Sequence, residues 1–156
     1  MHIYVLLKKQ GHWSNGSSKT MVKKLCDLID FKDELIYDQG KPVFINSNYF
    51  LSVSHSANLM AIAIADQEIG LDLEKNQALK PEVIERVKLD RDQPLEDWCR
   101  REATIKLYNN PEYLFKSAPA ATKFVIEEIC DGYTCVIASK TTLPKAKIFH
   151  LDEEIL

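Results

Sequence analysis

The residues from Leu59 to Ala65 constrain the fold most strongly, because this stretch is almost entirely apolar and shows no polar alternation. That pattern is typical of a strand that is covered on both faces. We therefore predict a central strand over residues 59–65. After the turn residues Asp66 and Gln67, a second strand is expected to form an antiparallel hairpin with it.

The second strand carries a pair of acidic residues. Apolar residues occupy every other position from Ile69 to Leu73, which places Asp72 and Glu74 together on the opposite face. Two neighbouring carboxylates repel each other unless a cation lies between them, and a divalent metal ion would supply that cation. The alternative is that both acids belong to the solvent-exposed face of a half-buried strand.

Residues 95–108 have the periodicity of a helix, with Asp92 as a candidate N-cap and Pro94 in the first turn. One arc of this helix, about 120° wide, is apolar. Its apolar members are Leu95, Trp98, Cys99 and Ile105. Glu102 and Lys106 fall inside the same arc, and charges rarely face a core unless they are paired or bind a ligand. Either they pair with each other, or Glu102 joins Asp72 and Glu74 in an oxygen-only magnesium site.

Further elements follow from periodicity and turn residues. Strands are expected at 2–7, 122–129, 133–138 and 147–150, and helices at 21–29 and 81–87. With 156 residues and an ordinary globular composition, the chain is expected to form a single domain over residues 1–156.

Charge and cysteine usage exclude several classes of protein. A net charge of −3 argues against binding nucleic acid through phosphate contacts. The four cysteines form no CxxC pair and are expected to be reduced. We see no leader and no apolar run of membrane-spanning length, so a cytoplasmic protein without membrane contacts is expected.

Two short segments carry polar groups that could meet an anion. In the turn Gly40-Lys41-Pro42, proline forces Lys41 into an extended conformation. Ser54 and His55 are neighbours on a predicted strand and point to opposite faces, so they cannot act as a nucleophile and its base. His55 is either a packed histidine or a donor to phosphate at the end of the strand.

The chain resembles the 4′-phosphopantetheinyl transferases of the surfactin-synthetase-activating type. Four blocks carry the resemblance in the family's order, and any one of them alone would be weak. They are 40–42 (GKP), 50–56 (FLSVSHS), 69–75 (IGLDLEK) and 98–106 (WCRREATIK). A weaker likeness extends to the opening strand at His2 and to the last residues, 153–156. The resemblance implies an α+β fold of two pseudo-twofold-related strand-and-helix halves sharing one site, with the first half abbreviated.

The resemblance also implies an activity, the transfer of 4′-phosphopantetheine from coenzyme A to a serine of an acyl or peptidyl carrier protein. It makes Asp72, Glu74 and Glu102 the Mg²⁺ ligands and places Lys106 at the same phosphates. By the same resemblance, Ser54 and His55 contact the nucleotide and phosphate end of coenzyme A, and Gly40, Lys41 and Pro42 lie beside its adenine. Glu102 or a metal-bound water would deprotonate the serine.

The chain departs from the family in two segments. The basic, aromatic segment after the first strand is reduced to a loop over 11–19, and the segment between Lys75 and Trp98, which docks the carrier in relatives, is shortened. Arg101 replaces a common lysine. Two alternatives therefore stay open: a non-catalytic relative that binds coenzyme A or a carrier protein, and a small Mg²⁺-dependent phosphoanhydride hydrolase. We expect a monomer, and the sequence leaves a dimer open.

Overall fold

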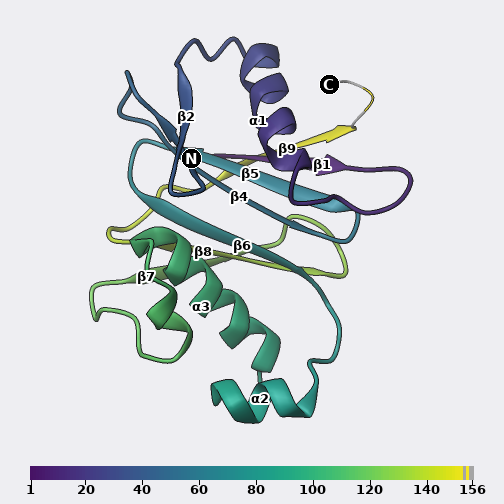
Figure 1. The fold of residues 1–156 in the computed structure, drawn as a ribbon, viewed down its shortest axis with the longest axis vertical. Helices are drawn as coiled ribbons and strands as arrows, with labels where there is room; N and C mark the ends of the chain where they lie inside the picture. Colours follow the sequence, from purple (N-terminus) through teal and green to yellow (C-terminus); the bar gives the residue numbers. More distant parts are fainter. Residues whose placement is uncertain (153, 155–156) are drawn as a thin grey trace. The chain divides into compact units, whose positions relative to one another are not determined.

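The computed structural model describes residues 1–152 and 154, so Glu153, Ile155 and Leu156 of the last block of resemblance lie outside the described residues. The fold is mixed α+β, as expected (Figure 1). It divides into two compact units, the first from Met1 to Glu68 together with the chain from Pro144 onward, and the second from Ile69 to Leu143.

The first unit contains a four-stranded sheet in the order β4-β5-β1-β9. Its elements are β1 (His2–Leu7), α1 (Ser17–Leu28), β2 (Leu35–Asp38), β3 (Lys41–Phe44), β4 (Phe50–Ser56), β5 (Leu59–Ala65) and β9 (Lys147–Asp152). β5 pairs with β1 on one side and with β4 on the other, and all seven of its residues are buried. The predicted central strand is therefore confirmed. α1 packs on this sheet through Val22, Leu25 and Cys26.

The second unit contains a three-stranded antiparallel sheet in the order β6-β8-β7. Its elements are β6 (Ile69–Lys75), α2 (Pro81–Val87), α3 (Pro94–Tyr108), the 3₁₀ helix η1 (Pro111–Leu114), β7 (Lys123–Glu127) and β8 (Tyr133–Ser139). α3 lies along β6 and β8, and its apolar contacts with the sheet include Val136 and Ala138 of β8 (Figure 1).

The predicted hairpin between residues 59–65 and 69–75 is wrong. Both edges of β5 are already paired, with β1 and β4, and β6 pairs with β8 in a separate sheet. The hairpin that does form is β4–β5, and its turn contains Ala57 in the left-handed region with φ 51°. The apolar pattern identifies each strand, but it does not determine which strand becomes its neighbour.

The order of elements is the same in the two units. In the first, β1 is followed by α1 and by the hairpin β4–β5, whose second strand pairs antiparallel with β1. In the second, β6 is followed by α3 and by the hairpin β7–β8, whose second strand pairs antiparallel with β6. The first unit adds the β2–β3 hairpin and β9, and the second adds α2 and η1.

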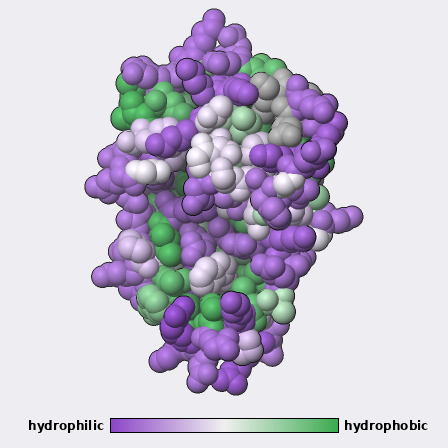
Figure 2. All heavy atoms as spheres, turned by 45° about the vertical axis from the view of Figure 1, so that its right-hand side comes forward, coloured by the Kyte–Doolittle hydropathy of each residue, from purple (hydrophilic) through white to green (hydrophobic). Residues whose placement is uncertain are grey.

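Among residues 1–152 and 154, no helix combines the length and the apolar composition that a membrane crossing requires. In the view of Figure 2, hydrophilic side chains cover most of the visible surface, and the hydrophobic ones form separate patches.

Candidate functional site

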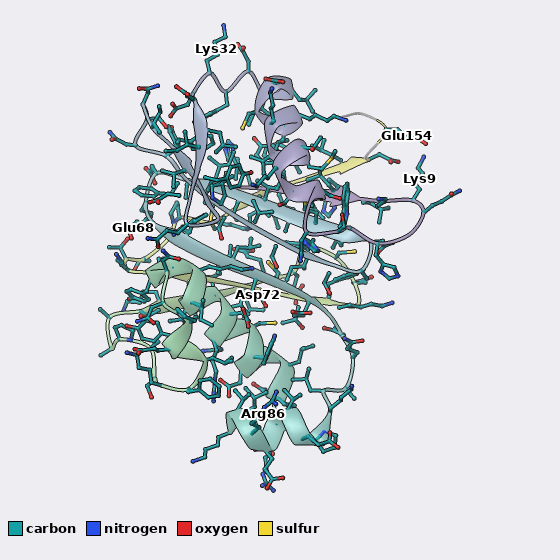
Figure 3. All side chains as sticks on the ribbon, in the orientation of Figure 1. Lys9, Lys32, Glu68, Asp72, Arg86 and Glu154 are labelled. Carbon is teal, nitrogen blue, oxygen red and sulfur yellow. The ribbon has the colours of Figure 1, made fainter. Side chains whose placement is uncertain are left out.

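The site begins with β6, whose acidic face is covered by α3. Gly70, Asp72 and Glu74 alternate along this face, and a Cβ atom at Gly70 would overlap the Ala103 carbonyl and lie 2.6 Å from the Leu107 backbone nitrogen. Gly70 therefore lets the helix backbone approach the strand closely. Asp72 is only 4% exposed as a result, so it does not lie on a solvent-exposed face (Figure 3).

The close approach also determines which face of α3 is buried. The buried residues are Cys99, Ala103, Thr104 and Leu107. The centre of this face lies about 120° around the helix from the centre of the predicted arc, although Cys99 belongs to both and Leu95 packs against the buried cluster. The prediction holds for Cys99 and Leu95 and is wrong for Trp98 and Ile105, because it gave weight to large apolar side chains, whereas a helix that touches a strand at a glycine needs small residues at the contact. Glu102 and Lys106 lie at the edge of the buried face and are half-buried.

Lys106 reaches from α3 to β6. Its Nζ donates to the Leu71 carbonyl oxygen at 2.9 Å and to Oδ1 of Asp72 at 3.1 Å. The side chain of Asp72 is 6% exposed and that of Lys106 is 30% exposed, so this is a largely buried ion pair. The charge of Lys106 also acts on Glu102, whose pKa it lowers, so the i,i+4 pairing considered from the sequence stays a prediction beside the ion pair with Asp72.

Glu102 lies one helical turn before Lys106. Burial is the main cause that raises the pKa of its carboxyl, the charge of Asp72 raises it further, and Lys106 opposes both. The charge of Asp72 on β6 therefore acts on Glu102 of α3, as a shared site requires.

Glu74 contributes its charge to the same region. The pKa of the Cys99 thiol is raised by burial first, and then by the charges of Asp72 and Glu74 and by a hydrogen bond with Asp72. Burial and Asp72 also raise the pKa of Cys135, which is on β8, to about 12. The surroundings of Asp72 are thus acidic, and the ammonium of Lys106 is the cation bound there.

The donor set fits Mg²⁺ by its chemistry, since three carboxylates offer the oxygen ligands that this ion prefers. As the side chains are placed, however, no group of three or more His, Cys, Asp or Glu residues among the described residues is close enough to hold a metal ion together. One carboxylate oxygen of Asp72 is bound by Lys106 instead. The three acids and Lys106 are brought together as an electrostatic cluster, and their roles as metal ligands stay a prediction.

The remaining predicted site residues belong to the first unit. Gly40 lies in the turn of the β2–β3 hairpin with φ 80°, a conformation that favours glycine, and Lys41 and Pro42 begin β3. Ser54 and His55 lie next to each other on β4, with Ser54 7% exposed and His55 half-buried. Their predicted contacts with coenzyme A stay a prediction.

Sequence reasoning missed the part that Arg101 plays in holding α3. Its guanidinium donates to the carbonyl oxygens of Val87, Lys88 and Leu114, at 2.7 to 2.9 Å. It also donates to both carboxylate oxygens of Asp97. The i,i+4 spacing of Asp97 and Arg101 predicts their ion pair. It does not predict the hydrogen bonds to carbonyl oxygens, because every residue type has the same backbone acceptor.

The positions of Glu102 and Lys106 depend on α3, and Arg101 fixes this helix to the C-terminal ends of α2 and η1. No protein-family model matches the chain, and no curated protein matches it.

Proposed function

We propose that the protein transfers the 4′-phosphopantetheine group of coenzyme A to a serine of an acyl or peptidyl carrier protein, in a reaction that depends on Mg²⁺. The observation that carries this proposal is the ion pair of Asp72 on β6 with Lys106 on α3, with Glu102 one helical turn before Lys106 and within reach of the charge of Asp72. These residues come from the two blocks of the resemblance that carry chemistry, and they are separated by about thirty positions in the chain. Nothing in their spacing alone requires them to be neighbours.

Three carboxylates would hold the metal ion in this reaction, those of Asp72, Glu74 and Glu102. A Mg²⁺ ion held by these carboxylates would supply positive charge against the pyrophosphate of coenzyme A. Lys106 would donate to the same phosphates. Its ammonium is already held in place by the Leu71 carbonyl oxygen, so little reorganisation is needed to present a donor.

The serine hydroxyl of the carrier attacks the β-phosphorus of coenzyme A, and the bond between that phosphorus and the bridging oxygen breaks to release 3′,5′-ADP. The serine proton passes to a base, and Glu102 is our candidate. Its raised pKa makes it a stronger base than an ordinary glutamate. The predicted contacts of Ser54, His55 and the turn Gly40-Lys41-Pro42 with the nucleotide end rest on the resemblance alone.

The shared element order of the two units supports an architecture of two related halves. Each unit has a strand, then a helix, then a hairpin that returns to the first strand. That arrangement is what the resemblance implies for the family.

Incubation with coenzyme A, MgCl₂ and a panel of apo carrier proteins tests the proposal, with the intact mass of each carrier as the readout. We expect the mass of one carrier to increase by a single phosphopantetheine group. In the presence of EDTA we expect no increase. Coenzyme A binding without any mass increase would favour the non-catalytic relative, and breakdown of coenzyme A without a carrier would favour the hydrolase. Either result overturns the proposed transfer.

A further inference from the structure

A groove with a volume of about 460 Å³ runs beside α3 in the second unit. Residues of α2 and α3, the segment after η1 and β7 line it. Those used below are Arg86, Lys88, Arg100, Phe115, Lys116 and Phe124. We call it the α3 groove.

The α3 groove is separate from the carboxylate cluster. The residues of α3 that line it are Asp97, Arg100, Arg101 and Thr104. At ~100° per residue, the centre of this set lies about 180° around the helix from Glu102 and Lys106. The sheet contacts of α3 lie between the two flanks. A molecule bound in the groove would therefore leave the proposed catalytic face open.

The charge of the α3 groove is opposite in sign to that of the whole chain, which is −3. Five of its lining residues are basic, and three of them form ion pairs. Arg101 binds Asp97, Lys116 binds Glu112, and Arg100 lies 3.9 Å from Glu96. Arg86 and Lys88 are exposed, and among the described residues neither side chain forms an ion pair (Figure 3 labels Arg86 on α2). Arg86 and Lys88 thus offer the groove positive charge that none of these ion pairs neutralises.

Aromatic rings accompany these cations. Phe115 is 67% exposed, the highest value among the exposed large hydrophobic residues. The guanidinium of Arg100 lies 5.2 Å from the centre of the Phe124 ring, and the ammonium of Lys116 lies 4.9 Å from that of Tyr113. Arginine and aromatic side chains are the residues that contribute most at protein–protein interfaces.

From this geometry we propose that the α3 groove binds an acidic, amphipathic segment of a partner protein. Carboxylates of the segment would pair with Arg86 and Lys88, and an aromatic or aliphatic side chain would cover Phe115. The apolar anchor favours a protein segment over a nucleic acid, which the net charge of the chain also disfavours. The proposal does not depend on the transfer activity, since the groove and the carboxylate cluster occupy different flanks of α3.

Fluorescence anisotropy with labelled helical peptides tests the groove. The probes carry Glu on one face and Phe, Leu or Trp at helical spacing on the other, and control peptides carry Lys in place of Glu. Saturable binding of at least one acidic probe is expected, with weaker binding at higher salt and none of the Lys peptides bound. Binding of no acidic probe, or equal binding of the Lys peptides, would overturn the proposal.

Two variants locate the binding. We expect the double change Arg86→Glu and Lys88→Glu to lower the affinity for the probe by about tenfold or more, because the charge of both exposed side chains is reversed. Phe115→Ser should weaken it by a similar factor. The matched control is Lys23→Glu with Lys24→Glu, which makes the same change in net charge at two exposed positions of α1. Equal losses in the groove variant and the control would show a non-specific charge effect and refute the site.

A single-stranded oligonucleotide serves as the competitor. Displacement of the probe by the oligonucleotide at equal or lower concentration would assign the groove to nucleic acid and end the proposal. Carrier modification is measured separately by mass, so failure of the groove proposal and failure of the transfer proposal give different results.

Discussion

Gly70 of β6 lies directly against the backbone of Ala103 in α3, with no room for a Cβ atom between them. Gly70→Ala should therefore force the helix away from the sheet and lower the free energy of unfolding by about 3 kcal/mol or more. Urea denaturation measures the change. Gly16→Ala is the control, because nothing lies within 4 Å of a Cβ there and its φ is −74°. Equal stability of the two variants would contradict the close contact.

Lys106→Met should destabilise the fold by about 2 kcal/mol, because it removes the ammonium beside the buried carboxylate of Asp72. This figure allows for the partial exposure of Lys106. Asp72→Asn in the same background should recover part of the loss, since the buried negative charge is then gone. A double-mutant cycle measures the coupling. Additive effects would contradict a direct interaction.

Arg101→Lys is expected to lower the free energy of unfolding by about 2 kcal/mol, since an ammonium cannot reach the three carbonyl oxygens and Asp97 together. The control is Arg100→Lys, whose ion pair with Glu96 is long, at 3.9 Å, and partly exposed. There we expect a change below about 0.5 kcal/mol. Thermal melts of both variants measure the change in stability. An equal loss of stability in the two variants would contradict the role of Arg101 in holding α3.

Cys130 should be the cysteine that a thiol reagent modifies in the native protein. It is exposed, whereas Cys26, Cys99 and Cys135 are buried. Burial raises the pKa of each of these three thiols, which lowers the reactive thiolate fraction further. Mass spectrometry after iodoacetamide treatment should find one adduct under native conditions and four in denaturant. Rapid native labelling of Cys99 would mean that α3 does not cover β6 as described.

Asp72→Ala should abolish carrier modification while the fold is retained, because Asp72 is the acid that both Glu102 and Lys106 adjoin. The readout is carrier mass, with far-ultraviolet circular dichroism as the check on folding. Glu85→Gln, at an exposed position of α2, is the matched control and should keep the rate of the unchanged protein. An unchanged rate in the Asp72 variant would remove this residue from the proposed site.

Periodicity predicted the individual elements well and their partners poorly. The strand over 59–65 was identified because both of its faces are apolar, but its pairing depends on contacts remote in sequence. The N-cap of α3 is Gln93 and not Asp92, whose backbone nitrogen donates to the Asp90 side chain. That local hydrogen bond competes with helix capping. The capping preferences of residue types, which were the basis of the prediction, do not reveal it.

From the sequence, Asp72 stands out through its pairing with Glu74 on one strand face, and Glu102 and Lys106 stand out as charges within a predicted apolar arc; their roles at a metal site stay a prediction. The bonds of Arg101 were not predictable, because three of its acceptors are backbone carbonyl oxygens. The true buried face of α3 was missed for a related reason. Its contact is made by Gly70 and Ala103, two residues that carry almost no hydrophobic signal.

The parallel pairing of β9 with β1 has a consequence for the order of assembly. During translation every strand of the second unit, which ends at Leu143, emerges before β9 is made, although β1 emerges first of all. The first unit, which contains β1, is thus completed only after the second unit has been made. β1 gains its second neighbour only after β9 has been made, and until then it presents an open edge to other nascent chains.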